Sequence, residues 1–282
     1  MKKGIELPTL VESLAHLCGS AKIQSGQHIK PVNKYCSTRL VLEGGFPPEW
    51  VSPRPPLRSK RVNNRIYELS YDQKAASSSE QSVLGGIKYK TVDLTAVVPD
   101  IGPALGISAK STGNAFRNLT NRMEEALGEC TNIHLMYPGF VFGFLHLIRF
   151  ATKREVKDIQ DVSFDDNAEP LPAIRRYHEV LVSLSGRSAI TEAGMRYEAV
   201  ALLVYTCRDG RADIWKGYPS KESPVHFLNF FRRLYNLYDL RYVYPDPDGR
   251  SARKEWRLET DALPSRFDTK TPFGWELRVA AE

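Results

Sequence analysis

The stretch GISAKSTGN, residues 106–114, places a serine and a lysine two positions apart, as Ser108 and Lys110. Side chains two apart on a β-strand share one face, so these two would point the same way. Asp93 stands fifteen residues before Ser108, and Glu124 stands fourteen residues after Lys110. Two carboxylates beside a lysine can bind a hard cation such as Mg²⁺ and stabilise charge on a reacting phosphate. The spacing therefore predicts a metal site for phosphate chemistry.

Two strands must hold the aspartate and the lysine. Residues 87–98, IKYKTVDLTAVV, alternate and are rich in β-branched side chains, which predicts a strand. The prolines and glycines of PDIGPALG, residues 99–106, predict a turn, and residues 107–111 would form the partner strand. We therefore expect Asp93 to meet Lys110 across a hairpin.

A helix must hold the glutamate, and it is predicted from residue 116 to about residue 127. At about 100° per residue, one apolar stripe forms from Phe116, Leu119, Met123 and Leu127. Glu124 falls on a flank of this stripe, beside Arg117 and Asn121. The same winding places Glu125 in solvent. The sequence therefore predicts Glu124 as the acid that reaches the edge of the sheet.

Asp93 followed by SAK at 108–110 resembles the motif of the PD-(D/E)XK nucleases, with serine in the place of the second acid. It is similar to the branch of restriction endonucleases that includes enzymes cutting around CCGG. In that branch a glutamate on the following helix supplies the missing acid, and Glu124 matches its position. The resemblance covers roughly residues 80–150. It implies an α/β (α+β) fold with a restriction-endonuclease-like core, a central mixed β-sheet flanked by helices.

The resemblance also implies an activity, Mg²⁺-dependent hydrolysis of DNA phosphodiester bonds at a specific double-stranded site, leaving 5′-phosphate and 3′-hydroxyl ends. Asp93 and Glu124 would bind the metal, Lys110 would orient the water or stabilise the transition state, and Ser108 would make a minor polar contact. A homodimer or higher homo-oligomer and a protective DNA methyltransferase are the implied partners. The alternatives are a repair or phage-defence nuclease of the same fold, and a non-catalytic DNA-binding protein on that fold.

The chain departs from the family pattern before the acid. Val92 precedes Asp93, whereas the literal Pro-Asp pair ends at Asp100, inside the expected turn. We therefore expect Asp100 to lie away from Lys110. The arginine-rich recognition motif of the CCGG enzymes is not evident after the lysine, so the target sequence is not carried over.

A second metal often takes a glutamate from the first core helix of such nucleases, and this resemblance offers Glu80 and Glu68 as candidates. A plain surface acid is the alternative reading of each. Three of the six histidines, His134, His146 and His178, show no metal-ligand spacing.

The formal net charge is +6, which is compatible with a nucleic-acid partner and does not require one. The stretch RPPLRSKRVNNR, residues 54–65, holds five basic residues and no acid. Arg58, Lys60 and Arg61 are its candidate phosphate contacts, with Arg117 and Asn121 on the helix as further DNA contacts. A solvated surface is the competing interpretation of the basic stretch.

The 282 residues suit a single nuclease domain, with a catalytic core at about 65–210, an N-terminal extension at 1–64 and a C-terminal part at 211–282. Further helices are predicted at 6–18, 173–184 and 226–240, and a buried strand at 197–207. Residues 140–150 read as a buried strand or helix.

The first residues mix charges into their apolar run, so no export is expected and the predicted location is cytoplasmic. No stretch approaches the ~18 apolar residues of a membrane span. Four scattered cysteines, Cys18, Cys36, Cys130 and Cys207, show no metal-type pairing, and reduced structural thiols are the expectation.

Overall fold

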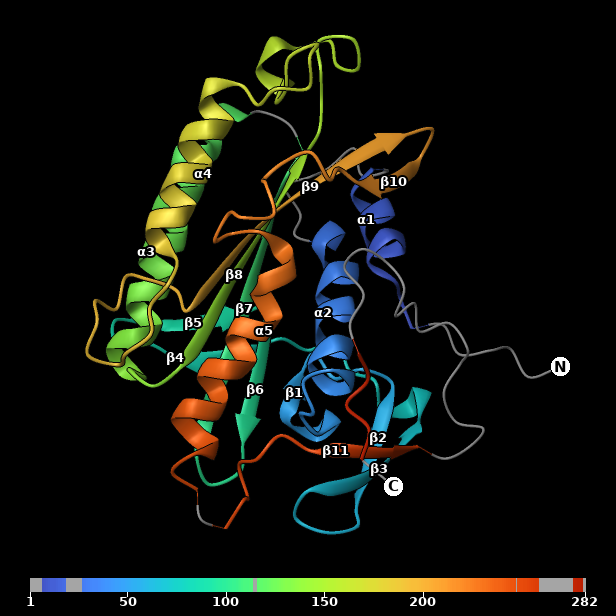
Figure 1. Cartoon of the computed structure of the whole chain (residues 1–282), viewed down its shortest axis with the longest axis vertical. Coiled ribbons are helices and arrows are strands. Elements are labelled where there is room, and N and C mark those ends of the chain that lie inside the picture. Colours follow the sequence, from blue (N-terminus) through green and yellow to red (C-terminus); the bar gives the residue numbers. More distant parts are fainter. Residues whose placement is uncertain (1–6, 19–26, 114–115, 247, 259–275, 281–282) are drawn as a thin grey trace, which may run out of the picture.

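The protein is described by a computed structural model over residues 7–18, 27–113, 116–246, 248–258 and 276–280. Within these residues the chain forms a mixed α/β structure, in which helices cover both faces of a central sheet (Figure 1). The prediction of a mixed sheet flanked by helices is confirmed at this level.

The central sheet has six strands in the order β1-β6-β7-β8-β9-β10. β7 runs parallel to β8 and β8 runs parallel to β9, whereas the other neighbours are antiparallel. The strands are β1 (Val51–Ser52), β6 (Leu94–Val98), β7 (Gly102–Thr112), β8 (Val141–Arg149), β9 (Ala199–Arg208) and β10 (Arg211–Ile214).

Two groups of helices pack on the sheet. One face carries α1 (Leu10–Cys18), α2 (Lys30–Leu42) and α5 (Phe227–Tyr238). The other face carries α3 (Leu119–Met136) and α4 (Pro172–Leu184), which lie side by side in Figure 1. Because α2 and α5 both fill the core, residues outside 65–210 belong to the same hydrophobic interior as the sheet.

Two small sheets accompany the central one. The first has the order β11-β3-β2, and the second is the hairpin β4-β5. Their strands are β2 (Leu57–Arg61), β3 (Ile66–Tyr71), β11 (Glu255–Leu258), β4 (Gln81–Leu84) and β5 (Tyr89–Val92). Short 3₁₀ turns span Gln27–Ile29, Pro48–Trp50, Gln73–Ala75, Phe116–Asn118 and Ile159–Asp161, and a π-helix spans Asp239–Val243.

Alternation along β7 decides which side chains face which helices. Leu105, Ile107 and Ala109 pack into the core beneath α1, α2 and α5. Ser108 and Lys110 therefore point to the face that carries α3 and α4. The predicted sharing of one face by these two side chains is confirmed, because Ser108 contacts a residue of α3, as described below.

Some element boundaries differ from expectation. The predicted strand 87–98 is two strands, β5 and β6, interrupted at Asp93. β7 begins at Gly102, because the turn needs only a few residues around Asp100, whose φ of 65° is left-handed. α3 continues to Met136, since buried side chains recur beyond the predicted end, at Cys130 and Ile133.

The ambiguous stretch at 140–150 forms a strand, β8, at the centre of the sheet. All of its side chains but the last are buried, because helices cover both faces and parallel strands lie on both sides. Periodicity cannot identify such a strand, since neither face is polar. Among the described residues, no helix combines the length and the apolar composition needed to cross a membrane.

The expectation of four reduced thiols is wrong at one pair. Cys18, at the end of α1, forms a disulfide with Cys207 on β9, across a sequence separation of 189 residues. Cys36 and Cys130 are free and buried. Sequence spacing could not reveal the pair, because the two residues meet only after α1 packs against the strands β9 and β10.

Cys207→Ser is expected to lower the free energy of unfolding, by up to about 5 kcal/mol if the chain-entropy account of a loop this long holds. Chemical denaturation with and without a reductant measures the effect. Reductant should bring the native protein to the stability of the variant and leave the variant unchanged. Equal midpoints for the native protein in both conditions would contradict the cross-link.

Candidate metal site

Asp93 lies at the break between β5 and β6, opposite β7, the strand that carries Ser108 and Lys110. Its neighbour Leu94 pairs with Ile107, so the aspartate falls beside the next residues of β7. One carboxylate oxygen, Oδ2, accepts a hydrogen bond from the backbone N–H of Ala109 at 2.8 Å and lies 3.3 Å from Oγ of Ser108. Interrupting the strand at Asp93 thus lets its side chain bind the β7 backbone in place of a regular ladder bond.

Lys110 is the cation of the site. Its Nζ lies 3.6 Å from Oδ2 of Asp93. Burial alone would lower the pKa of Lys110, but Asp93, Glu129 and Glu125 outweigh it and raise the pKa, so the side chain stays an ammonium. Asp100 is exposed in the turn, so the prediction that Asp93, and not Asp100, lies beside the lysine is confirmed.

The second carboxylate of the site belongs to Glu129, on α3. Its Oε2 accepts a hydrogen bond from Oγ of Ser108 at 2.9 Å, and the residue is only 4% exposed. Its Oε1 is buried and has no hydrogen-bond partner among the described residues. The nearest cation to Oε1 is Nζ of Lys90 at 3.9 Å, which is too long for a hydrogen bond.

The predicted placement of Glu124 is wrong. Glu124 is exposed on α3, whereas Glu125 is half-buried and contributes to the field at Lys110. The winding was misjudged because Phe116 belongs to a 3₁₀ turn and the α-helix begins only at Leu119. The stripe that faces the sheet is therefore rotated, and it brings Glu129, one turn after Glu125, against Ser108.

Ser108 joins the two acids but cannot satisfy both. Its hydroxyl has one hydrogen to donate, whereas Asp93 and Glu129 both present a carboxylate oxygen to it. The shorter contact, to Glu129, takes that hydrogen, while Asp93 still has the Ala109 N–H and the Lys110 ammonium as partners. The Ser108 hydroxyl thus lies between the two carboxylates and within reach of both.

Burial is the main cause of an unusual ionisation at Glu129. It raises the pKa of this carboxyl above its ordinary value, against the opposing influence of Lys110, Lys90 and the Ser108 hydroxyl. Between the ordinary pKa and the raised one, the folded protein holds a proton that the unfolded chain releases. The free energy of unfolding therefore falls as pH rises through that window.

Glu129→Gln is expected to raise the free energy of unfolding of the metal-free protein at neutral pH. The amide occupies the same space and still accepts from Ser108, but it carries no charge to desolvate. Urea denaturation with a metal chelator measures the gain, which should disappear at acid pH, where the native glutamate is protonated. A loss of stability at neutral pH would show that the ionised carboxylate is adequately compensated.

The site offers few ligands, so it suits a cation that needs only one or two carboxylates from the protein. Asp93 and Glu129 offer two carboxylates, and no group of three or more His, Cys, Asp and Glu side chains suited to a metal occurs among the residues the structure describes. Mg²⁺ commonly binds through one or two carboxylates and fills its other positions with water and phosphate oxygens. The buried, unpartnered Oε1 of Glu129 is the observation that fits such an ion.

The other acids proposed for a second metal lie elsewhere. Glu68 is on β3 of a separate small sheet, where it pairs with Lys60 at 3.6 Å. Glu80 is exposed in the loop before β4. Neither lies on a helix, and α2, which precedes the motif and packs on the sheet, contains no acidic residue.

The proposed DNA contacts are divided between two places. Arg58 and Lys60 lie on β2 and pair with Asp72 and Glu68, at 2.9 and 3.6 Å. Arg61, at the end of the same strand, donates a hydrogen bond to Asn64. On α3, Asn121 is exposed. The side chain of Arg117 lies outside the part of the molecule that the structure describes.

A buried histidine, His146, lies beside Lys110 but carries no charge. His146 pairs with Lys110 across β8 and β7. Its ring nitrogens contact Oγ1 of Thr112 at 3.2 Å and the hydroxyl of Tyr177 at 2.9 Å. Burial lowers the pKa of His146 to about 3, so the ring is a neutral link between the sheet and α4.

Sequence reasoning missed Glu129 and Lys90. The sequence held a signal for Glu129, because the apolar residues Ala126, Cys130 and Ile133 continue at helical spacing past the predicted end of the helix. Lys90 could not be found in that way, since its proximity to Glu129 depends on how the β4-β5 hairpin packs on α3.

No protein-family model, curated protein or solved structure matches the chain. The arrangement of Asp93, Ser108, Lys110 and Glu129 is therefore what any functional inference must rest on.

Proposed function

We propose that the protein is a Mg²⁺-dependent endonuclease of the PD-(D/E)XK type that hydrolyses DNA phosphodiester bonds. The observation that carries the proposal is the convergence of Asp93 and Glu129 on Ser108, beside Lys110, with one glutamate oxygen buried and unpartnered. The restriction-endonuclease-like core is part of the same proposal. The mixed α/β sheet supports it, with the motif strand β7 antiparallel to β6 and parallel to β8.

Each residue then has a separate task. Asp93 and Glu129 hold the cation, which when bound acidifies a water and neutralises charge on the phosphate. Lys110 holds the attacking water through its ammonium or compensates charge on the phosphoryl oxygens. Ser108 positions both carboxylates, and the Ala109 N–H fixes the orientation of the aspartate.

The proposed substrate is a specific double-stranded DNA site, cut in the manner of a type II restriction enzyme. A homodimer would match a two-fold symmetric site, and a cognate methyltransferase would protect the host DNA. The 5′-phosphate and 3′-hydroxyl ends follow from the same family resemblance.

Incubation of plasmid DNA with the protein, with Mg²⁺ and with chelator, tests the proposal. Discrete fragments that form only with Mg²⁺ are the expected result. Smearing or nicking would favour a repair or phage-defence nuclease, and DNA binding without cleavage would favour a non-catalytic protein on this fold. Equal cleavage in chelator would reject a metal-dependent reaction altogether.

The basic strand β2 gives a prediction about DNA affinity. Arg58 and Lys60 are exposed, so their ion pairs are weak, about 1 kcal/mol or less, and can be exchanged for phosphates. Replacing Arg58, Lys60 and Arg61 together by alanine is expected to weaken binding to all sequences alike. The slope of log affinity against log salt should fall by about 1 for each lost contact.

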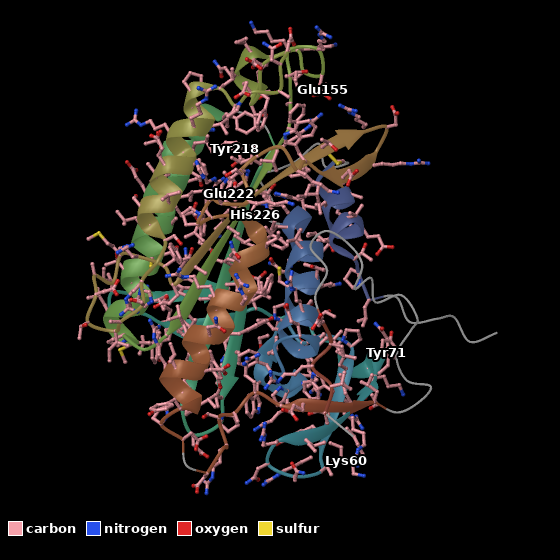
Figure 2. All side chains as sticks on the ribbon, in the orientation of Figure 1. Lys60, Tyr71, Glu155, Tyr218, Glu222 and His226 are labelled. Carbon is pink, nitrogen blue, oxygen red and sulfur yellow. A yellow bond between two sulfur atoms is a disulfide. The ribbon has the colours of Figure 1, made fainter. Side chains whose placement is uncertain are left out.

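A matched control removes three exposed cations from the other end of the molecule, Lys153, Arg154 and Lys157. Figure 2 shows that Lys60 and Glu155, which lies among these three, are at opposite ends of the long axis. The control variant should keep the native salt slope. If the native protein and both triple variants have equal salt slopes, the basic side chains of β2 make no phosphate contacts and are an ordinary solvated surface.

A further inference from the structure

A cavity of about 640 Å³ lies apart from the candidate metal site, at the end of α5. Its volume is in the range of small-molecule sites. Four separate segments line it, through Arg65, Asn236, Asp239, Leu240, Val243, Tyr244, Ala252, Arg253 and Arg278. A site built from such distant segments exists only in the folded chain.

Three guanidinium groups at the cavity share two carboxylates. Arg253 binds Asp239 through two hydrogen bonds of 2.8 and 2.6 Å. Arg65 and Arg278 both approach the same oxygen, Oε1 of Glu255, at 3.1 and 4.0 Å. These five side chains therefore leave one positive charge uncompensated.

Arg278 is the least satisfied of the three arginines. Its Nε is buried and has no hydrogen-bond partner among the described residues. Burial and the neighbouring Arg253 lower the pKa of Arg278, which reflects the same shortage of negative charge. The 4.0 Å separation from Glu255 is too long for a hydrogen bond, and the side chain of Arg278 is 33% exposed, so its guanidinium can bind an anionic ligand.

Apolar and aromatic side chains at the end of α5 also line the cavity. The π-helix Asp239–Val243 continues α5, and such helices often occur at functional sites. It places Leu240 at 65% exposure, and Tyr244, directly after it, is 89% exposed. Asn236, on the last turn of α5, adds an exposed amide that can donate and accept.

We propose that this cavity binds a nucleotide, with its phosphate at Arg278 and Arg65 and its base stacked on Tyr244. Arginine suits a phosphate because its planar fork matches two oxygens. An exposed aromatic ring suits a base, because it can stack on the face of any base. The site is independent of the proposed cleavage reaction, since it shares no residue with the candidate metal site.

Calorimetric titration of the full chain in metal chelator, with adenosine 5′-monophosphate as the probe, tests the proposal. Saturable binding of one nucleotide per chain is expected. Adenosine and inorganic phosphate, which each lack one half of the ligand, should bind at least tenfold more weakly. Asp93→Asn should bind like the native protein, whereas a loss of binding in that variant would place the nucleotide at the metal site and overturn the assignment.

Two variants assign the two halves of the site. Arg278→Gln should weaken binding at least tenfold, and Arg257→Gln, an exposed arginine that does not line the cavity, should not. Tyr244→Ala should weaken binding at least about fivefold. Tyr89→Ala is its control, because Tyr89 is also exposed, at 70%, and lies on β5.

Folding of each variant is checked by its unfolding midpoint. If Arg278→Gln is unstable, Tyr244→Ala decides alone, since so exposed a side chain contributes little to the fold. Native affinity in Tyr244→Ala, or no saturable binding by the native chain, would overturn the proposal.

Discussion

Glu129→Gln is expected to abolish Mg²⁺-dependent DNA cleavage while leaving the fold and DNA binding intact. The amide still accepts the hydrogen bond from Ser108, but it is a poor ligand for a hard cation, and Asp93 alone remains. Removing a metal contribution of several kcal/mol corresponds to a rate loss of roughly a thousandfold or more. Cleavage of a plasmid at saturating DNA, together with calorimetric titration of Mg²⁺, measures both effects.

Glu124→Gln is the matched control on the same helix. Its side chain is exposed, so both cleavage and Mg²⁺ affinity should remain native. Full activity in Glu129→Gln combined with loss in Glu124→Gln would restore the assignment that the sequence alone suggests. Native activity in both variants would show that neither glutamate of α3 takes part in cleavage.

The positions of Asp93, Ser108 and Lys110 could be predicted because side chains on a strand alternate with a repeat of two residues. Two residues per repeat put Ser108 and Lys110 on one face whatever the strand boundaries are, and β7 has both boundaries beyond the predicted ones. Asp93 then followed from the pairing of one strand with the next. Errors of a few residues in strand length left this conclusion unchanged.

The helical half could not be predicted as safely. An error in the start of a helix rotates every later side chain, and the 3₁₀ turn Phe116–Asn118 introduced such an error. The apolar residues Leu127 and Met123 also misled the assignment of the buried face, since Leu127 is exposed and Met123 only half-buried. The choice between Glu124 and Glu129 therefore depended on the helix packing.

Contacts between distant segments were beyond the reach of sequence patterns. The disulfide of Cys18 and Cys207 and the ion pair of Lys90 and Glu129 each require the tertiary fold. The same is true of the basic stretch at 54–65, which contains no acid of its own. In the folded chain its basic side chains form ion pairs with Glu49, Asp72, Glu68 and Glu255.

Lys110→Met is expected to lower the cleavage rate by two to three orders of magnitude, roughly the cost of removing one group that stabilises transition-state charge. It should not weaken Mg²⁺ binding, because the lysine is not a ligand and its charge opposes a cation beside Asp93 and Glu129. Lys110→Met should therefore lower the cleavage rate alone, whereas Glu129→Gln should lower both the cleavage rate and the affinity for Mg²⁺. Single-turnover cleavage and calorimetric Mg²⁺ titration give the two quantities.

The pH profile of the same variant supplies a second, independent readout. In the native protein, cleavage should rise with pH through the raised pKa of Glu129, because only the ionised carboxylate binds the metal. Lys110 is one of the groups that hold this pKa down, so its removal should move the acidic limb of the residual activity to higher pH. Methionine keeps most of the length of the side chain without its charge. An acidic limb at the native position, or Mg²⁺ affinity lost along with cleavage, would mean that Lys110 supports the site by packing and not through its ammonium.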